Sequence, residues 1–117
     1  MCREVTNLPS LQKNGDLLIV ISGSGETEQL IAFTKNAKKI GANIVLISAK
    51  DESTIGNLAD DVIQIGNNEQ YGKVLGMPMG TVFELSTLLF LEATISHIIH
   101  EKGIPEEIMR ERHANLE

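Results

Sequence analysis

A short segment near the start of the chain combines side-chain hydroxyls with glycines directly after an apolar run. Its five relevant residues are Ser22, Gly23, Ser24, Gly25 and Thr27. Hydroxyls donate hydrogen bonds to phosphate oxygens, each worth roughly 1.5–3 kcal/mol when the acceptor is charged, and glycines let a ligand approach the backbone closely. A helical pattern begins at Thr27, and the amide hydrogens at the start of a helix attract anions. The segment therefore predicts a loop that binds a phosphate monoester through neutral donors.

Two familiar nucleotide-binding loops do not fit this segment. A dinucleotide fingerprint requires a third glycine three residues after Gly25, where this chain has Glu28. A Walker A loop requires Gly-Lys-Ser/Thr, which the segment lacks. A polar turn without any ligand is the remaining alternative. The loop lies between an apolar strand of the kind that is usually buried and a helix, and this context favours anion binding over a simple polar turn.

The hydrophobic pattern predicts an α/β fold in which strands alternate with helices. The expected strands cover residues 17–22, 43–48 and 61–65. The expected helices cover residues 27–40, 53–58 with Ser53 as N-cap, and 81–100, and a final helix follows Pro105. The first strand is apolar without alternation, which is typical of a parallel strand covered on both faces. We therefore expect a partial doubly wound parallel sheet of about three strands flanked by helices, with a long C-terminal helix.

Composition limits the class of protein. The 117 residues suffice for one domain, and a net charge of −6 argues against nucleic-acid binding, which relies on clustered lysine and arginine. Cys2 is the only cysteine, so an intrachain disulfide is excluded. The sequence does not start with a basic region followed by an apolar stretch, so we expect no secretory signal and a cytoplasmic protein.

The expected helix 81–100 is apolar on nearly every face. Glu84, Glu92 and His97 interrupt it, which argues against a membrane span. One sheet face cannot bury a helix that is apolar all round. We therefore expect the second face of this helix to be a subunit contact, and no membrane.

Three segments carry motifs that occur in this order in a known family. They are residues 21–27 (Ile-Ser-Gly-Ser-Gly-Glu-Thr), residues 78–84 with Pro-Met-Gly-Thr and Phe-Glu, and residues 112–117 (Arg-His-Ala-Asn-Leu-Glu). Together they resemble the SIS (sugar isomerase) domain family, closest to its 6-phospho-3-hexuloisomerases. The resemblance implies a flavodoxin-like sheet in a single, truncated SIS domain over residues 1–117. It also implies interconversion of 3-hexulose 6-phosphate and fructose 6-phosphate without a metal or other cofactor.

The resemblance assigns roles to four further residues. Glu84 stands where the family has a glutamate base, which moves a proton between neighbouring carbons through an enediol. His113 falls in the terminal motif and would move protons between sugar oxygens or open a cyclic sugar. Gly80 and Thr81 would contact the sugar. The alternatives are that Glu84 only complements the helix dipole and that His113 is a surface residue.

Three other titratable residues are given no catalytic role. His97 and His100 have a spacing that could share a metal ion, but no third ligand with suitable spacing accompanies them. We expect them on the surface or at an interface. Glu26 precedes the first long helix and is expected to cap or tune it.

The sequence departs from the family at its start. Relatives begin with a substantial segment that includes a sheet strand and a Gly-Arg-Ser-Gly loop, and this sequence lacks it. Without that strand, residues 17–22 have an unpaired edge, and exposed edges pair with other chains. We therefore expect a homo-oligomer, or association with a chain that supplies the missing half, and not an isolated monomer.

Two functions are compatible with these observations. The first is a phosphosugar isomerase whose activity depends on a completed pocket. The second is a noncatalytic phosphosugar-binding module or remnant, which keeps the loop without turnover. Both take a sugar phosphate as ligand.

Overall fold

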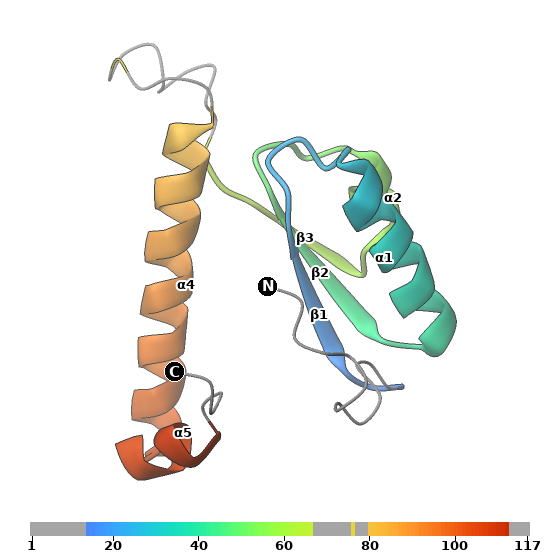
Figure 1. Ribbon diagram of the computed structural model, residues 1–117. Coiled ribbons are helices and arrows are strands. Elements are labelled where there is room, and N and C mark those ends of the chain that lie inside the picture. Colours follow the sequence, from blue (N-terminus) through green and yellow to red (C-terminus); the bar gives the residue numbers. More distant parts are fainter. Residues whose placement is uncertain (1–13, 67–75, 77–79, 113–117) are drawn as a thin grey trace.

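The computed structural model describes residues 14–66, 76 and 80–112 of the chain. Its elements, in chain order, are β1 (Leu17–Ile21), α1 (Glu28–Ile40), β2 (Asn43–Ser48), α2 (Thr54–Leu58), β3 (Asp61–Gln64), α4 (Thr81–Lys102) and α5 (Glu106–Arg112). The first five elements form consecutive β-α-β units, and α4 and α5 follow them (Figure 1). This order agrees with the sequence prediction. Most of the segment 66–80, which connects β3 to α4, lies outside the described residues.

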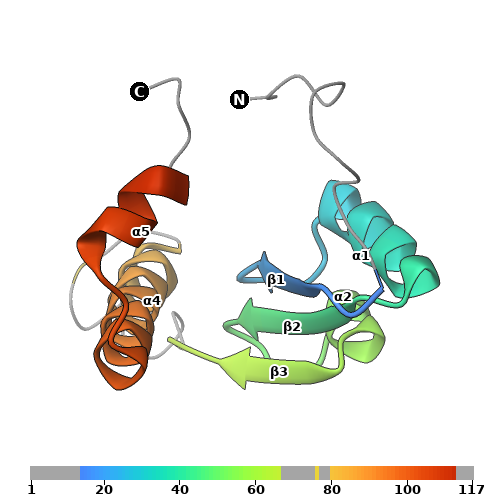
Figure 2. The ribbon, with the colours of Figure 1, turned by 90° about the horizontal axis from the view of Figure 1, so that it is seen from below.

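The three strands form one parallel sheet in the order β1-β2-β3. Ile21 pairs with Ile47, and Ser48 pairs with Gln64, so the carboxyl ends of all three strands lie at one edge of the sheet. Helices α1 and α2 cover one face, whereas α4 lies on the other side (Figure 2). Helices on both sides of a parallel sheet define a doubly wound arrangement. The predicted fold class is confirmed.

The hydrophobic core lies between the sheet and α1. Ile44, Leu46 and Ile55 are fully buried in it together with Ala37, and Val20 is nearly so. The strand residues come from alternate positions, Ala37 comes from α1 and Ile55 from α2, as expected for helices packed on a pleated sheet. The core therefore holds β1, β2, α1 and α2 together as the scaffold for the loops at the carboxyl edge.

The start and stop signals of α1 act as predicted. Thr27 is its N-cap residue, and Gly41 ends it with a left-handed φ of 87°. The Gly41 N–H donates to the Ala37 and Lys38 carbonyls, which is a typical glycine C-cap. The helix is thus fixed at both ends, and its first turn lies directly after the predicted phosphate-binding segment.

One face of β1 is exposed, so the prediction of a strand covered on both faces is wrong. Leu17, Ile19 and Ile21 alternate with the core residues and are 60%, 48% and 43% exposed. In the described part of the chain only the α1 side packs closely on this strand, because α4 does not come near enough to bury these side chains. β1 also forms an edge of the sheet. The predicted unpaired edge is therefore present among the described residues.

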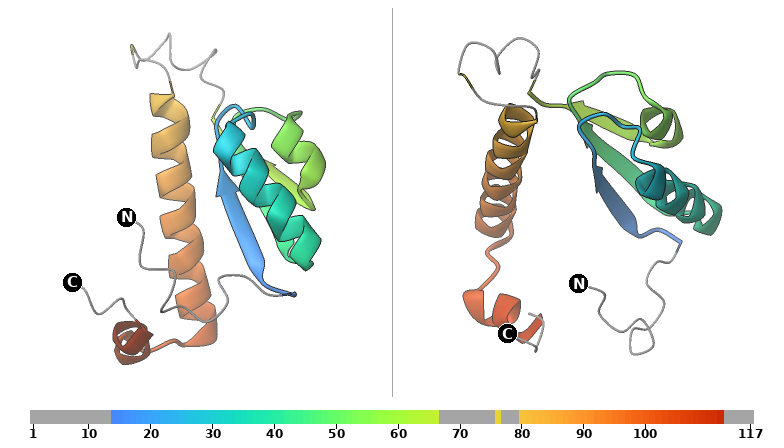
Figure 3. Two further views of the ribbon diagram at one scale, coloured as in Figure 1. Left: turned by 45° about the vertical axis from the view of Figure 1, so that its right-hand side comes forward. Right: turned by 45° about the horizontal axis from the view of Figure 1, so that its top comes forward.

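Helix α4 contacts the rest of the domain mainly through its first two turns. Its buried residues are Val82, Phe83 and Thr87. The start of α4 lies beside the loops at the carboxyl edge of the sheet (Figures 1 and 3). Many other apolar side chains along α4 are exposed: Leu85, Leu88, Leu89, Ile95 and Ile98. These side chains form a surface that another chain could cover.

Among the described residues, α4 is the one helix that could cross a membrane by length and composition. Single apolar helices of soluble proteins pass the same test, so the property distinguishes little on its own. The expectation of no membrane stays a prediction based on Glu84, Glu92 and His97.

Candidate active site

The predicted phosphate-binding segment lies at the carboxyl edge of the sheet, where doubly wound folds bind their ligands. It comprises residues 22–27 between β1 and α1, here called the hydroxyl loop. Two other segments meet it at this edge: the residues after β2, and the first turn of α4. Residues from three distant parts of the chain therefore surround one small region.

The hydroxyl groups of the loop are positioned by hydrogen bonds to other residues of the same loop. The oxygens of Ser22 and Thr27 are 3.1 Å apart and hydrogen-bonded. Ser22 Oγ also accepts from the Gly25 N–H at 3.0 Å, and Ser24 Oγ accepts from the Glu26 N–H at 3.1 Å. A hydroxyl that accepts such a bond keeps its own hydrogen to donate. Ser24 and Thr27 are exposed, so their hydroxyls can reach a ligand.

The N-terminus of α1 lacks the usual side-chain cap. Thr27 is the N-cap residue, yet its side chain makes no capping hydrogen bond; its hydroxyl pairs with Ser22 instead. The amide hydrogens of a first helical turn have no acceptor within the helix. An anion at this position would accept them, in the place that a capping side chain normally takes.

The end of β2 supports the backbone of the hydroxyl loop. The Ser48 hydroxyl donates to the Gly23 carbonyl at 3.2 Å, and the Ala49 N–H donates to the same oxygen at 3.1 Å. Ser48 is fully buried. The Ser22 N–H donates to the Ile47 carbonyl at 3.0 Å, continuing the parallel pairing past the strand. The first half of the loop is therefore fixed by main-chain bonds to β2.

The start of α2 packs against the second half of the loop. The Ile55 N–H donates to the Gly25 carbonyl at 3.1 Å. Ser53 is the N-cap of α2, as predicted, and its Oγ accepts from the Gly56 N–H at 3.0 Å. Gly25 has a left-handed φ of 67°, and a Cβ added there would overlap the Ser53 side chain. Both conformation and packing therefore require glycine at this position.

Glu26 links the loop to α2 through its side chain. Its Oε1 accepts from the Thr54 N–H at 2.8 Å. The Thr54 hydroxyl and N–H lower the pKa of the Glu26 carboxyl, and the Lys50 charge adds to this effect. We expected Glu26 to cap or tune the first long helix. The capping prediction is wrong, because the carboxylate accepts from an N–H at the start of α2, 28 residues away in the sequence. An effect of its charge on α1 stays a prediction.

The first turn of α4 lies against the hydroxyl loop. A Cβ added at Gly23 would be 3.2 Å from Phe83 Cδ1, and one added at Gly66 would be 3.1 Å from Phe83 Cα. Phe83 is buried, and the neighbouring Glu84 is exposed. The Glu84 N–H donates to the Gly80 carbonyl at 2.9 Å. The packing of Phe83 therefore brings the exposed carboxylate of Glu84 to the edge of the sheet that carries the hydroxyls.

Comparison with known proteins decides the family. A family model described as the SIS domain matches residues 5–95. This match includes the hydroxyl loop and most of α4. The chain belongs to the SIS domain family.

Several relatives of this SIS domain carry the name 3-hexulose-6-phosphate isomerase. The one from Methylomonas aminofaciens is 56% identical over 111 residues, which are 93% of this chain and 61% of the relative. The one from Bacillus subtilis is 38% identical over 109 residues, 88% of this chain and 58% of the relative. The chain therefore spans about three fifths of the length of these relatives.

Solved structures share the fold. A crystal structure of a hypothetical protein is 33% identical with a TM-score of 0.75, and it covers 97% of this SIS domain and 62% of that chain. A second, from Methanococcus jannaschii, is 36% identical with a TM-score of 0.71, over 97% and 61% of the two chains. For the second protein a molecular function of 3-hexulose-6-phosphate isomerase was inferred.

The SIS domain brings most of the predicted site residues to one edge. The phosphate-binding candidates form a single loop: Ser22, Gly23, Ser24, Gly25 and Thr27. Glu84 and the sugar-binding candidates Gly80 and Thr81 lie at the start of α4, next to that loop through Phe83. His113 lies outside the described residues. The roles of all these residues stay predictions.

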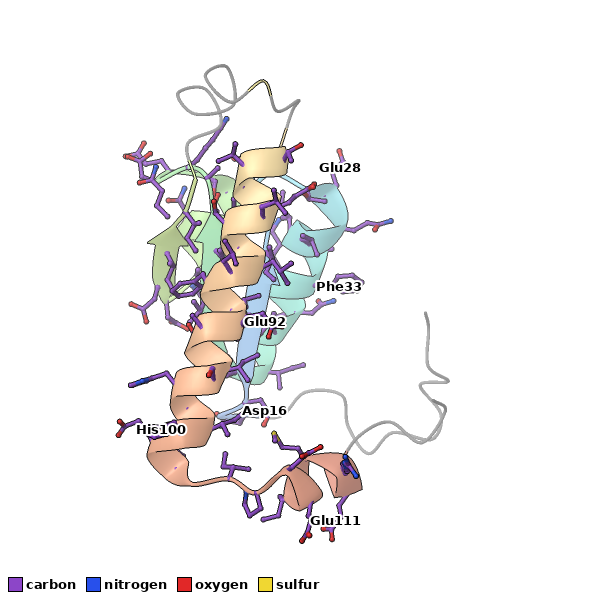
Figure 4. All side chains as sticks on the ribbon, turned by 90° about the vertical axis from the view of Figure 1, so that its left-hand side faces the viewer. Asp16, Glu28, Phe33, Glu92, His100 and Glu111 are labelled. Carbon is purple, nitrogen blue, oxygen red and sulfur yellow. The ribbon has the colours of Figure 1, made fainter. Side chains whose placement is uncertain are left out.

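The two histidines of α4 lie away from the loop. His97 and His100 belong to the last turns of the helix, and His100 lies near the end opposite the hydroxyl loop (Figure 4). In residues 14–66, 76 and 80–112, no cluster of three His, Cys, Asp or Glu could hold a metal ion. The prediction of surface positions agrees with their exposure.

Three contributors to the site were not predicted. Ser48 follows an apolar strand just as Ser22 does, so the same signal, a polar residue where a strand leaves the sheet, could have found it. The contact between Ser53 and Gly25 and the packing of Phe83 on Gly23 join segments far apart in the sequence. Such contacts depend on the tertiary fold, and the local sequence carries no signal for them.

Proposed function

We propose that this chain belongs to a phosphosugar isomerase that interconverts 3-hexulose 6-phosphate and fructose 6-phosphate. The observation that carries the proposal is the uncapped start of α1 next to the exposed hydroxyls of Ser24 and Thr27. A phosphate group would accept bonds from the Ser24 and Thr27 hydroxyls and from the first amides of α1. The names of the relatives support the hexulose phosphate as substrate.

Isomerisation then requires one base that moves a proton between carbons and one group that moves a proton between oxygens. The carboxylate of Glu84 would take the proton from the carbon beside the carbonyl, which leaves an enediol, and return it to the former carbonyl carbon. His113 would carry the proton between the two oxygens. Atoms balance without an oxidant or a cofactor. With the phosphate held at the hydroxyl loop, the reacting carbons are positioned for the start of α4.

The first test removes a single hydroxyl. Thr27→Val keeps the size of the side chain and deletes the donor, so fructose 6-phosphate should bind about 10- to 100-fold more weakly, as expected for one bond to a charged acceptor. Isothermal titration calorimetry measures this change. Thr94→Val is the matched control, because the Thr94 hydroxyl donates to the Phe90 carbonyl within α4, away from the hydroxyl loop. Equal affinity of both variants would contradict the phosphate site.

The second candidate function is a phosphosugar-binding module without turnover. The exposure of Glu84 favours it, because a general base is usually tuned by burial, and the described residues leave this carboxylate open to solvent. Binding of fructose 6-phosphate without conversion of 3-hexulose 6-phosphate would select the module. Turnover by the purified chain would select the isomerase.

We further propose that another chain covers the open edge of β1 and the exposed apolar residues of α4, as a second copy or as a chain that completes the sheet. Light scattering at micromolar concentration should then give a mass above that of one chain. Ile19→Lys, on the exposed face of β1, should shift the protein toward the monomer. Phe33→Lys is the control, because Phe33 is also a large exposed apolar residue but lies on α1 (Figure 4). A stable monomer before substitution would contradict this proposal.

The expected cellular location follows from the same chemistry. A single cysteine, which has no partner for an intrachain disulfide, and a sugar-phosphate substrate both fit the cytoplasm, which we propose as the location.

A further inference from the structure

The hydroxyl loop is anchored to α2 by a side chain that has no part in the proposed chemistry. Glu26 lies between Gly25 and Thr27 and reaches out of the loop to the first residue of α2. We infer that Glu26 is a positioning residue, whose carboxylate holds the loop in the conformation that receives the phosphate by accepting the Thr54 N–H. The inference rests on the function proposed above.

Three bonds at consecutive residues show how the anchor works. The Ser24 Oγ accepts the Glu26 N–H at 3.1 Å, the Gly25 carbonyl accepts the Ile55 N–H at 3.1 Å, and the Glu26 carboxylate accepts the Thr54 N–H at 2.8 Å. The last two bonds tie adjacent residues of the loop to adjacent residues of α2. The first orients the Ser24 hydroxyl. Loss of the carboxylate would therefore release the part of the loop that lies between two phosphate donors.

The charge of Glu26 and its role as an anchor have opposite effects on the affinity for phosphate. A carboxylate next to Thr27 repels a phosphate dianion, so removing its charge alone would strengthen binding. Loss of the anchor would weaken binding, because the donors would no longer be held in place. An alanine and a glutamine at this position therefore separate the two effects. Glutamine keeps an acceptor oxygen but carries no charge.

The carboxylate is available as an acceptor throughout the neutral range. The bonds from the Thr54 hydroxyl and N–H hold the pKa of Glu26 below its ordinary value, with a contribution from Lys50. The other charged groups on the segment before α2 are Asp51 and Glu52, both exposed. Because the pKa is lowered on folding, the stabilisation that depends on the Glu26 charge is complete above the ordinary carboxyl pKa and is lost as the pH falls through the lowered value.

The test measures fructose 6-phosphate affinity near neutral pH for Glu26→Ala, Glu26→Gln and Glu28→Ala. Glu28 is a matched control, since it is an exposed acid at the start of α1 that points away from the sheet (Figure 4). Glu26→Ala should weaken binding on the order of tenfold. Glu26→Gln should bind as well as the unchanged protein or more tightly, and so should Glu28→Ala.

Hydrogen exchange of the Ile55 and Thr54 amides provides a readout that needs no ligand. Both should exchange faster in Glu26→Ala, whereas glutamine should restore their protection. Equal affinity of Glu26→Ala and Glu26→Gln, or unchanged protection of these amides in Glu26→Ala, would overturn the inference. If the unchanged protein fails to bind the sugar phosphate while the amides respond as expected, the proposed function fails and the anchor remains as a purely structural contact.

Discussion

Replacing Glu84 by glutamine is expected to lower kcat for isomerisation by about 10²–10⁴-fold, with KM little changed. The amide is close in size to the carboxylate and can still accept hydrogen bonds, but it cannot take a proton from carbon. Glu84 lies in the first turn of α4, beside Gly80, so the substitution leaves the hydroxyl loop intact. A coupled assay that follows fructose 6-phosphate from 3-hexulose 6-phosphate measures the change.

The matched control for this prediction is Glu92→Gln. Glu92 is also an exposed acid on α4, more than two turns farther along and away from the loops (Figure 4). It should keep full activity, and both variants should bind fructose 6-phosphate like the unchanged protein. Full turnover in Glu84→Gln would assign the proton transfer to another group.

The sequence predicted the elements because each carries a local signal. The apolar runs of β1 and β2 and the Gly41 C-cap of α1 lie within a few residues of the features that they determine. The number of layers over β1 was mispredicted. An apolar run shows that a strand is able to be buried on both sides, but it does not show whether a second layer packs closely enough to do so.

The same distinction between local signals and long-range packing applies to the candidate site. Ser22, Ser24 and Thr27 could be found because they lie within six consecutive residues of one loop, and their spacing itself suits an anion. The contacts that hold the loop could not be found, because Ser48, Ser53 and Phe83 reach it from 25 or more residues away. Long-range packing follows from the topology of the sheet, which brings the ends of β1 and β2 to one edge.

Replacing Gly25 by alanine is expected to lower the free energy of unfolding by about 2–4 kcal/mol and to abolish measurable binding of fructose 6-phosphate. Two costs add. A left-handed φ of 67° strains any residue with a Cβ, and this Cβ would overlap the Ser53 side chain. Ser53 would have to move and give up its bond with the Gly56 N–H, which caps α2. The loop and its support would therefore shift together.

Gly103→Ala separates these two costs. Gly103 has a similar left-handed φ of 58°, but a Cβ added there would meet nothing within 4 Å. Its loss of stability should be about 1–2 kcal/mol, from backbone strain alone, and ligand binding should be unaffected. Denaturant unfolding of both variants, followed by titration of the folded proteins, gives the comparison. The prediction fails if both substitutions lower the free energy of unfolding equally and Gly25→Ala still binds fructose 6-phosphate. In that case the hydroxyl loop tolerates displacement, and its close packing on α2 does not determine the shape of the phosphate site.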